Sequence, residues 1–227
     1  MFKFPKTISV EGNIGAGKST FIDFIQELED IKVAKEPLHE WQNVNGQNLL
    51  NRMYKFPKEN TFLFQVLALL TIVRDHLSHK YCATKTRVVE RFMGSRCFIK
   101  NAHKNGHLTD AENMVLSDWR TFLENCPLIE MKADLIIYLR TSPQKAYQRI
   151  KKRNREEELN ISYEYIQQLH DYHEEWLMDH TSVDHRVIVI DADLDLPELV
   201  SVYESTRDEI VKLAKEGGSD WPPMSLK

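Results

Sequence analysis

The stretch TISVEGNIGAGKSTF, from Thr7 to Phe21, decides the fold of this chain. Its first part, Ile8 to Val10, has the apolar, β-branched character of a buried strand. Gly12 to Ser19 follow the pattern G-x-x-x-x-G-K-S, whose glycines let the backbone turn successive N–H groups around an anion. Apolar residues then recur at helical spacing, so a helix begins at Lys18 with its positive end toward the loop. A plain glycine-rich turn is the weaker interpretation, because the motif lies in the strand–loop–helix context that it requires.

This loop predicts the binding of a nucleoside triphosphate. Lys18 would contact the β- and γ-phosphates, and the Ser19 hydroxyl would bind Mg²⁺. The residues expected to bind ATP are Gly12, Asn13, Ile14, Gly15, Ala16, Gly17, Lys18, Ser19 and Thr20.

Length and composition are those of an ordinary globular chain. Its 227 residues suffice for one well-buried α/β domain and are few for two. We therefore expect a single domain over residues 1–227, ending in a loose tail from residue 216. Hydrophobic residues make up 42% and charged residues 28% of the chain. A net charge of −4 argues against a general nucleic-acid surface but suits a protein with a small anionic ligand.

Neither a membrane span nor a targeting segment is expected. The longest apolar stretch, Phe62 to Val73, contains Gln65 and Thr71, so we expect no stretch to reach the length of a membrane span. The first strand begins about six residues after Met1, which leaves no room for a signal or transit peptide. We therefore expect a cytoplasmic protein without a membrane partner. A mitochondrial form that lacks its transit peptide is the alternative.

Cysteines and histidines do not indicate a metal centre. Cys82, Cys97 and Cys126 are odd in number and form no CxxC pair, which is typical of free thiols in a reducing compartment. His170 and His173 lack a carboxylate or thiolate at a matching spacing. We interpret them as packing or solvent-facing side chains.

Strand and helix patterns alternate along the chain. Apolar runs predict five strands, which start near residues 6, 31, 87, 133 and 187. Helical spacing predicts helices over residues 46–56, 62–77, 109–124, 163–177 and 196–213, with Pro57 interrupting the first and a further helix beginning near Pro143. This order predicts an α/β fold with one five-stranded, doubly wound parallel sheet surrounded by helices.

Charged residues follow the second and third predicted strands. Glu36 comes just after the strand at 31–35, and Glu90 and Arg91 end the strand at 87–91. Ligands bind at the carboxyl ends of the strands in doubly wound sheets, so these side chains are expected beside the phosphate loop. Glu90 would organise Mg²⁺, and Arg91 would orient an acceptor hydroxyl or its partner carboxylate. A surface-loop glutamate and a surface ion pair are the alternatives.

Three further features leave two interpretations each. Trp41 would stack on a base or anchor the core. Gln65, an amide within an apolar helix pattern, would hydrogen-bond a base edge or a backbone group. The charge run from Arg149 to Glu158 has no apolar stripe and would form a mobile lid over a triphosphate or a solvated helix face.

A small-molecule kinase fits these residues best. A GTPase would require an N-K-x-D motif and a D-x-x-G motif after a strand, and the sequence contains neither. An ATPase motor would need a longer chain and an aspartate at the end of the third strand, where Glu90 stands instead.

Linked motifs extend from about Ile8 to Leu196: GNIGAGKST, EPLHEW, NVNGQNLLNRMYKFP, VVERF, ADLIIYLRTSP, RIKKRNREEE, LHDYHEEWL and DADLDL. With these motifs the chain resembles the deoxynucleoside kinases, and it looks closest to those of the mitochondrial thymidine kinase type and the invertebrate multisubstrate type. The resemblance implies a P-loop kinase fold with an arginine-rich lid. It also implies ATP- and Mg²⁺-dependent phosphorylation of the 5′-hydroxyl of deoxynucleosides for nucleotide salvage, and a homodimer built on helices such as those at 62–77 and 109–124.

Carried over position by position, the resemblance implies a catalytic set of Glu36, Arg91 and Lys18, with Glu36 as general base on the 5′-hydroxyl. Ser19 and Glu90 would bind Mg²⁺. The residues implied to bind the nucleoside are Glu36, Trp41, Met53, Tyr54, Gln65, Ala68, Ile72, Arg91 and Glu158. Among these, Gln65 would contact the base edge, and Tyr54 with Glu158 the 3′-hydroxyl. The cations implied to bind ATP are Arg153 and Arg155 at the phosphates and Arg149 near the adenine.

Two departures from the family pattern concern the base. The family has E-R-S followed by a segment ending S-A-R or S-D-R, whereas the segment after Glu90-Arg91 here is Phe-Met-Gly-Ser-Arg and is one residue shorter. Ile72 stands where the deoxycytidine and purine kinases carry an arginine, and Arg74 is two residues away. With Ala68 and Ile72 near the base, we expect a preference for pyrimidines, with thymidine first, deoxycytidine as a further substrate, and broad specificity.

Two other functions stand as alternatives. A nucleoside monophosphate kinase of the thymidylate type shares the phosphate loop and a Glu-Pro pair near the second strand, but Glu36 would repel its acceptor phosphate. A catalytically silent, kinase-like structural subunit would not need Lys18, Ser19 and Arg91, which are all present.

Overall fold

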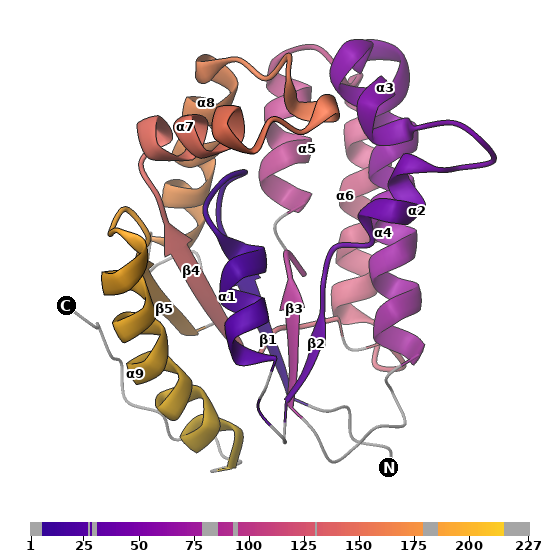
Figure 1. The fold of residues 1–227 in the computed structure, drawn as a ribbon. Coiled ribbons are helices and arrows are strands. Elements are labelled where there is room, and N and C mark those ends of the chain that lie inside the picture. Colours follow the sequence, from indigo (N-terminus) through magenta and orange to yellow (C-terminus); the bar gives the residue numbers. More distant parts are fainter. Residues whose placement is uncertain are drawn as a thin grey trace.

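The fold is built on one parallel β-sheet (Figure 1). The protein is seen here in a computed structural model, which describes residues 6–26, 28, 31–78, 86–92, 95–129, 131–178 and 186–215. The strands are β1 (Thr7–Glu11), β2 (Ile31–Ala34), β3 (Thr86–Glu90), β4 (Leu135–Arg140) and β5 (Arg186–Asp191), in the order β2-β3-β1-β4-β5. All neighbouring strands are parallel, so the predicted doubly wound sheet is confirmed.

Helices cover both faces of this sheet. They are α1 (Lys18–Ile25), α2 (Leu38–Gln42), α3 (Leu49–Lys55), α4 (Pro57–Ser78), α5 (Ser95–Lys104), α6 (Asp110–Asn125), α7 (Pro143–Arg153), α8 (Tyr163–Leu177) and α9 (Leu196–Lys215), with a short 3-10 helix, η1 (Glu156–Glu158). One face of the sheet carries α1 and α9, and the other carries α4, α5 and α8 (Figure 1). The short helices α2 and α3 pack on α4 beside the β2 edge of the sheet.

The strands divide their side chains between two hydrophobic cores. In β4, Ile137 and Leu139 pack with α1 and α9, whereas Ile136 and Tyr138 pack with α5, α7 and α8. This alternation follows from the two-residue period of a strand, and it explains why a strand covered on both faces is apolar throughout. The phosphate loop leaves the end of β1 between the two helix layers, at the edge where all five strands end.

The helix α4 begins earlier than predicted. The sequence pattern predicted a helix over 62–77 and treated Pro57 as an interruption, whereas Pro57 is the first residue of α4. Proline is tolerated there because the N–H groups of a first helical turn have no acceptor within the helix. Only Phe56 separates α3 from α4, so the chain bends sharply between them.

The same helix corrects the expectation that no apolar stretch could span a membrane. Among the described residues, α4 has 22 residues and a mean hydropathy of 1.2 over its best window, which by length and composition alone is enough to cross a membrane. Within the fold, however, α4 buries Asn60, Gln65, Thr71 and His76. Polar groups need partners when they are buried, so we interpret α4 as a core helix.

The cysteines that the structure describes are free thiols. Cys97 is buried in the core and Cys126 is partly buried. Cys82 and the expected tail from residue 216 lie outside the described residues.

Candidate active site

The phosphate loop between β1 and α1 is fixed by close packing. Gly12 has a φ of 145°, and a Cβ at this position would lie 2.7 Å from the carbonyl oxygen of Leu139 at the end of β4. Asn13 donates from Nδ2 to the carbonyl oxygen of Ile166 in α8 at 2.8 Å. The loop therefore has a rigid backing from β4 and α8, and its glycine is required by space as well as by conformation.

Lys18 lies inside the loop. Its Nζ donates to the carbonyl oxygens of Gly12 at 3.1 Å and Asn13 at 2.9 Å, and only 5% of the residue is exposed. Burial and the neighbouring charge of Arg91 lower the pKa of Lys18 to about 8, and the carboxylate of Glu36 partly opposes them. An ammonium group in so dry a place attracts an anion more strongly than it would in water.

The side-chain oxygens of Ser19 and Glu90 lie together near Lys18. The Ser19 hydroxyl donates to Glu90 Oε1 at 3.0 Å, and the backbone N–H of Glu36 donates to Glu90 Oε2 at 3.4 Å. Among the described residues, no group of three or more His, Cys, Asp or Glu side chains is placed to hold a metal ion by itself. Mg²⁺ is commonly held by one or two carboxylates together with substrate phosphates, so a hydroxyl and one carboxylate fit its chemistry.

Glu36 and Arg91 form an ion pair at the ends of β2 and β3. Arg91 Nε lies 2.7 Å from Glu36 Oε1, and the side chains are 11% and 17% exposed, respectively. Burial is the largest single influence on the pKa of Arg91 and would lower it, but the negative charges around it, Glu36 first and then Glu11 and Glu90, together raise it. The guanidinium also lies 4.5 Å from the ring centre of Phe98. Arg91 is therefore a permanent cation that holds Glu36 in place.

A cavity of about 150 Å³ joins these groups to an apolar pocket. The phosphate loop lines one end with Ile14, Gly15 and residues 17–20, and Glu36, Glu90 and Arg91 line the middle. The far end is formed by Leu38, Trp41, Leu50, Met53, Tyr54, Phe64, Gln65, Ala68, Ile72, Ser95 and Phe98. Phosphate-binding, acid–base and apolar groups thus share one space, as in a two-substrate site.

The sequence left two interpretations for each of Trp41 and Gln65, and in the structure both side chains are buried and also line the cavity. Trp41 is buried, donates from Nε1 to Thr71 Oγ1 at 3.0 Å and packs edge-on against Phe64, yet its ring also lines the cavity. Gln65 is buried and lines the cavity too, and its amide hydrogen-bonds no other described residue. A buried amide needs partners, which a bound base edge would supply.

Tyr54 of α3 and Glu158 of η1 both line the cavity. Burial, and then the neighbouring Tyr165 and Glu158, raise the pKa of Tyr54 well above its usual value, so its hydroxyl stays protonated. Glu158 is buried and accepts from Arg153 Nη2 at 2.6 Å and from Arg155 Nη1 at 3.0 Å. The two arginines of the charge run therefore reach the cavity mouth, held by one carboxylate.

The charge run, from Arg149 to Glu158, is more buried than either interpretation of the sequence assumed. Its first part belongs to α7, where Ile150 is buried in the core, and its last part forms η1, where Glu157 and Glu158 are buried. A solvated face is therefore wrong for Glu157 and Glu158, whereas Glu156 is exposed, and Ile150 anchors the run in the core. The mobile lid stays a prediction.

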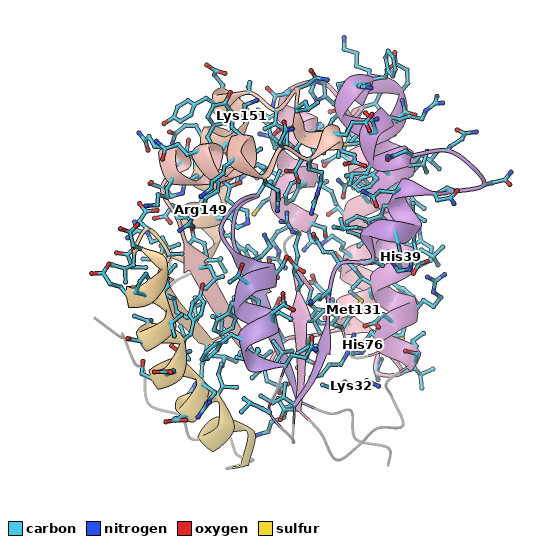
Figure 2. The ribbon with its side chains drawn as sticks, viewed as in Figure 1. Lys32, His39, His76, Met131, Arg149 and Lys151 are labelled. Atoms are coloured by element: carbon cyan, nitrogen blue, oxygen red, sulfur yellow. The ribbon has the colours of Figure 1, made fainter. Side chains whose placement is uncertain are left out.

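A second hollow, of about 500 Å³, lies on the outer side of the loop. It is lined by Gly15, Ala16, Gly17, Thr20, Lys145, Gln148, Arg149, Lys152, Arg153, Leu194, Asp195, Leu199 and Tyr203. Figure 2 shows Arg149 and Lys151 on opposite sides of α7, with Arg149 on the side toward the start of α9. Arg149 thus lies away from the apolar pocket but beside the phosphate loop. The end of a nucleoside triphosphate that is farther from the apolar pocket would reach this side of the loop.

Comparison with known proteins agrees with this geometry. A family model described as deoxynucleoside kinase matches residues 8–215. The chain belongs to the deoxynucleoside kinase family. It is 36% identical over 209 residues to mitochondrial thymidine kinase 2 of Homo sapiens, which covers 90% of this chain and 77% of that protein. It is 34% identical to deoxycytidine kinase of Homo sapiens over 199 residues, covering 78% and 76%, and 34% identical to deoxycytidine kinase 2 of Gallus gallus over 201 residues, covering 78% and 75%.

The protein is accordingly a deoxynucleoside kinase, a transferase that phosphorylates deoxynucleosides on a P-loop kinase fold. This membership supports a deoxynucleoside kinase over the nucleoside monophosphate kinase and the silent structural subunit that the sequence left as alternatives.

The structure gathers the predicted site residues of this deoxynucleoside kinase into the cavity, with four exceptions. Ala16 and Arg149 line the outer hollow only, whereas Gly12 and Asn13, at the start of the loop, line neither space. Arg74, which lies two residues after the position where the deoxycytidine and purine kinases carry an arginine, is exposed and forms an ion pair with Glu40. The individual roles of the gathered residues stay predictions.

Sequence reasoning missed several residues at this site of the deoxynucleoside kinase. Ser95 and Phe98 line the cavity from α5, a helix that the sequence analysis did not predict. The spacing of Phe98 and Ala102, both buried, was the available signal. Glu157 was taken as part of the charge run, and nothing in its local sequence indicates the partners described below.

Proposed function

We propose that this deoxynucleoside kinase transfers the γ-phosphoryl group of ATP to the 5′-hydroxyl of a deoxynucleoside, with Glu36 as general base. The observation that carries this proposal is the Glu36–Arg91 ion pair in the same cavity as Lys18 and Ser19. A fixed carboxylate can accept the proton of a hydroxyl as the hydroxyl attacks phosphorus. The same carboxylate would repel an acceptor that carries a phosphate, so its position favours a neutral acceptor.

The phosphate-binding groups supply positioning and charge. Phosphoryl transfer passes through a loose transition state, so little covalent chemistry falls to the protein. Lys18, Arg153 and Arg155 would neutralise the charge on the transferred group, and Arg149 would lie near the adenine. Ser19 and Glu90 would hold Mg²⁺, which supplies further positive charge when it is bound. Each guanidinium has five donors, so the lid arginines can keep Glu158 while binding phosphate.

The apolar end of the cavity would hold the nucleoside. Gln65 offers a donor and an acceptor to the edge of the base, and Trp41 and Met53 would pack against the base. Tyr54 and Glu158 would hydrogen-bond the 3′-hydroxyl of the sugar. Tyr54 suits this role because its protonated hydroxyl can donate and accept.

We further propose that pyrimidines are preferred, with thymidine first and deoxycytidine next. Ala68 and Ile72 line the base end of the cavity, and Arg74 is held outside it by Glu40. A pocket of this kind favours the methyl group of thymine. The names of the relatives, thymidine kinase 2 and deoxycytidine kinase, support the same class of substrate.

A substrate panel tests this proposal. The measurement is kcat/KM with ATP·Mg²⁺ for the four deoxynucleosides, and for thymidine 5′-monophosphate as an alternative acceptor. We expect thymidine to give the highest value, deoxycytidine the next, and the monophosphate none. The highest value for a purine deoxynucleoside would overturn the pyrimidine preference, and faster phosphorylation of the monophosphate than of thymidine would overturn the hydroxyl-acceptor mechanism.

We also propose that the enzyme is a homodimer that pairs through α4 and α6. The two helices pack together through Leu69 and Leu116. On their outer faces they expose large apolar side chains, namely Leu63, Leu70 and Leu77 of α4 and Met114, Trp119 and Phe122 of α6. Large apolar side chains exposed on two helices that pack together support pairing with another chain.

A further inference from the structure

Two consecutive glutamates of η1 accept hydrogen bonds from different parts of the chain. Glu158 binds the arginines of the charge run, as described above. Glu157 has other partners, and its Oε1 accepts from Gln42 Nε2 at 2.9 Å and from Asn48 Nδ2 at 2.8 Å. Only 6% of Glu157 and 5% of Glu158 are exposed. Together they link the arginine segment to two residues that lie more than a hundred positions earlier in the chain.

The partners of Glu157 belong to the elements that line the nucleoside pocket. Gln42 is the last residue of α2, directly after Trp41. Asn48 is the N-cap of α3, where its Oδ1 accepts from the backbone N–H of Asn51 at 2.9 Å. The helix α3 carries Tyr54 into the cavity. A single carboxylate therefore connects the wall of the nucleoside pocket to the segment that holds the phosphate-directed arginines.

We propose that Glu157 is a positioning residue that couples nucleoside binding to the placement of Arg153 and Arg155. The inference rests on the proposed function, because it assigns the two arginines to the phosphates. A nucleoside that fixes α2 and α3 would, through Glu157, also fix η1, so ATP would meet arginines that are already in place. Coupling of this kind makes each substrate bind more tightly when the other is bound.

The charge of Glu157 suits a permanent link between η1 and the helices α2 and α3. Burial is the largest single influence on the pKa of Glu157 and would raise it, but the hydrogen bonds from Asn48, a backbone N–H and Gln42, together with the charge of Arg155, lower it overall. Glu157 therefore accepts these bonds as a carboxylate, and hydrogen bonds to a charged group are stronger than neutral ones. Glu156, its neighbour in η1, is exposed, and its carboxylate bonds no other described residue. The chain thus offers an equally charged control one position away.

Asn48→Asp breaks the link and keeps the helix cap. Aspartate is as good an N-cap as asparagine, but its carboxylate repels Glu157 instead of donating to it. We expect the enhancement of ATP-analogue affinity by saturating thymidine to be lost, and kcat to fall about ten- to a hundredfold, the range for a lost hydrogen bond to a buried charge. Adding Glu157→Gln should restore both, because the new amide can donate to the new carboxylate. Adding Glu156→Gln, which removes the same charge, should restore neither.

The outcomes separate the inference from the proposed function. If the wild-type enzyme phosphorylates thymidine but Asn48→Asp keeps its substrate coupling, or if both glutamine changes restore it equally, Glu157 has no positioning role. If the wild-type enzyme does not phosphorylate deoxynucleosides at all, the proposed function fails first. Gln42→Ala removes one donor without touching a cap, so it serves if Asn48→Asp does not fold. It should lower the coupling by a smaller factor, and unchanged coupling in that variant would overturn the inference.

Discussion

Lys18 makes ATP binding depend on pH in the alkaline range. Its pKa is lowered to about 8 in the free enzyme, so Nζ is charged below this pH and increasingly neutral above it. Bound phosphates favour the charged form and raise this pKa, so binding above pH 8 requires the uptake of a proton. We expect the affinity for a non-hydrolysable ATP analogue with Mg²⁺ to weaken about tenfold between about pH 7 and about pH 9. Calorimetric titration at several pH values measures this slope.

Lys18→Arg is the control for this pH dependence. The guanidinium stays charged throughout the range, so the variant should bind the analogue with a nearly flat pH profile even if its absolute affinity is lower. Equal slopes for the wild-type and variant enzymes would show that another group titrates.

Single residues differ in how far their surroundings could be predicted. Glu36, Glu90 and Arg91 were predicted at the site because the ends of parallel strands meet at one edge of a sheet. Trp41 could not be assigned to pocket or core, because its partner Thr71 becomes a neighbour only through the packing of α2 on α4. Glu157 was missed for the same reason, since its partners lie 115 and 109 positions away in sequence.

Elements with strong local signals were predicted well. The phosphate loop was predicted because glycine is required at its turns, and a Cβ on Gly15 would lie only 2.5 Å from the carbonyl oxygen of Ala146. The strands begin within two residues of their predicted positions, since each is a short apolar run with charged or turn residues at its ends.

Short helices were the main failure at this scale. The helix α2 has five residues, which is too short for a hydrophobic period to show. In α5, the three consecutive residues Cys97, Phe98 and Ile99 are all buried, so its sequence pattern resembles a strand as much as a helix. Pro57 was taken as an interruption because proline breaks a helix interior, although it also begins helices.

At the scale of the whole molecule, the outer surface of α4 and α6 predicts a dimer. Leu70 is 57% exposed and Trp119 is 51% exposed, and each lies in an apolar row on its helix. We expect the enzyme to have twice the mass of one chain in sedimentation equilibrium. Leu70→Glu together with Trp119→Glu should give a monomer, because two buried and unpaired carboxylates would oppose association.

Val200→Glu is the matched control for the dimer. Val200 is also an exposed apolar residue on a helix, at 36%, but it lies on α9 at the opposite face of the sheet. This variant should remain a dimer. A monomeric wild-type enzyme, or a Val200 variant that dissociates like the double variant, would contradict pairing through α4 and α6.

In the proposed mechanism, the donor and acceptor halves of the reaction meet at Glu36. The phosphate loop follows β1, Glu36 follows β2 and Arg91 follows β3, and these three strands are neighbours in the sheet. The helices α2 to α5 supply the apolar end of the cavity, where the nucleoside would bind. We propose that Glu36 takes the proton of the acceptor hydroxyl.

The most direct test compares turnover and nucleoside binding in Glu36→Gln. Glutamine keeps the size and the hydrogen-bonding oxygen of Glu36 but cannot act as a base, so we expect kcat with thymidine to fall on the order of 10²- to 10⁴-fold. Thymidine binding, measured by calorimetry without ATP, should stay close to the wild-type value. Near-normal turnover by the variant would contradict the account.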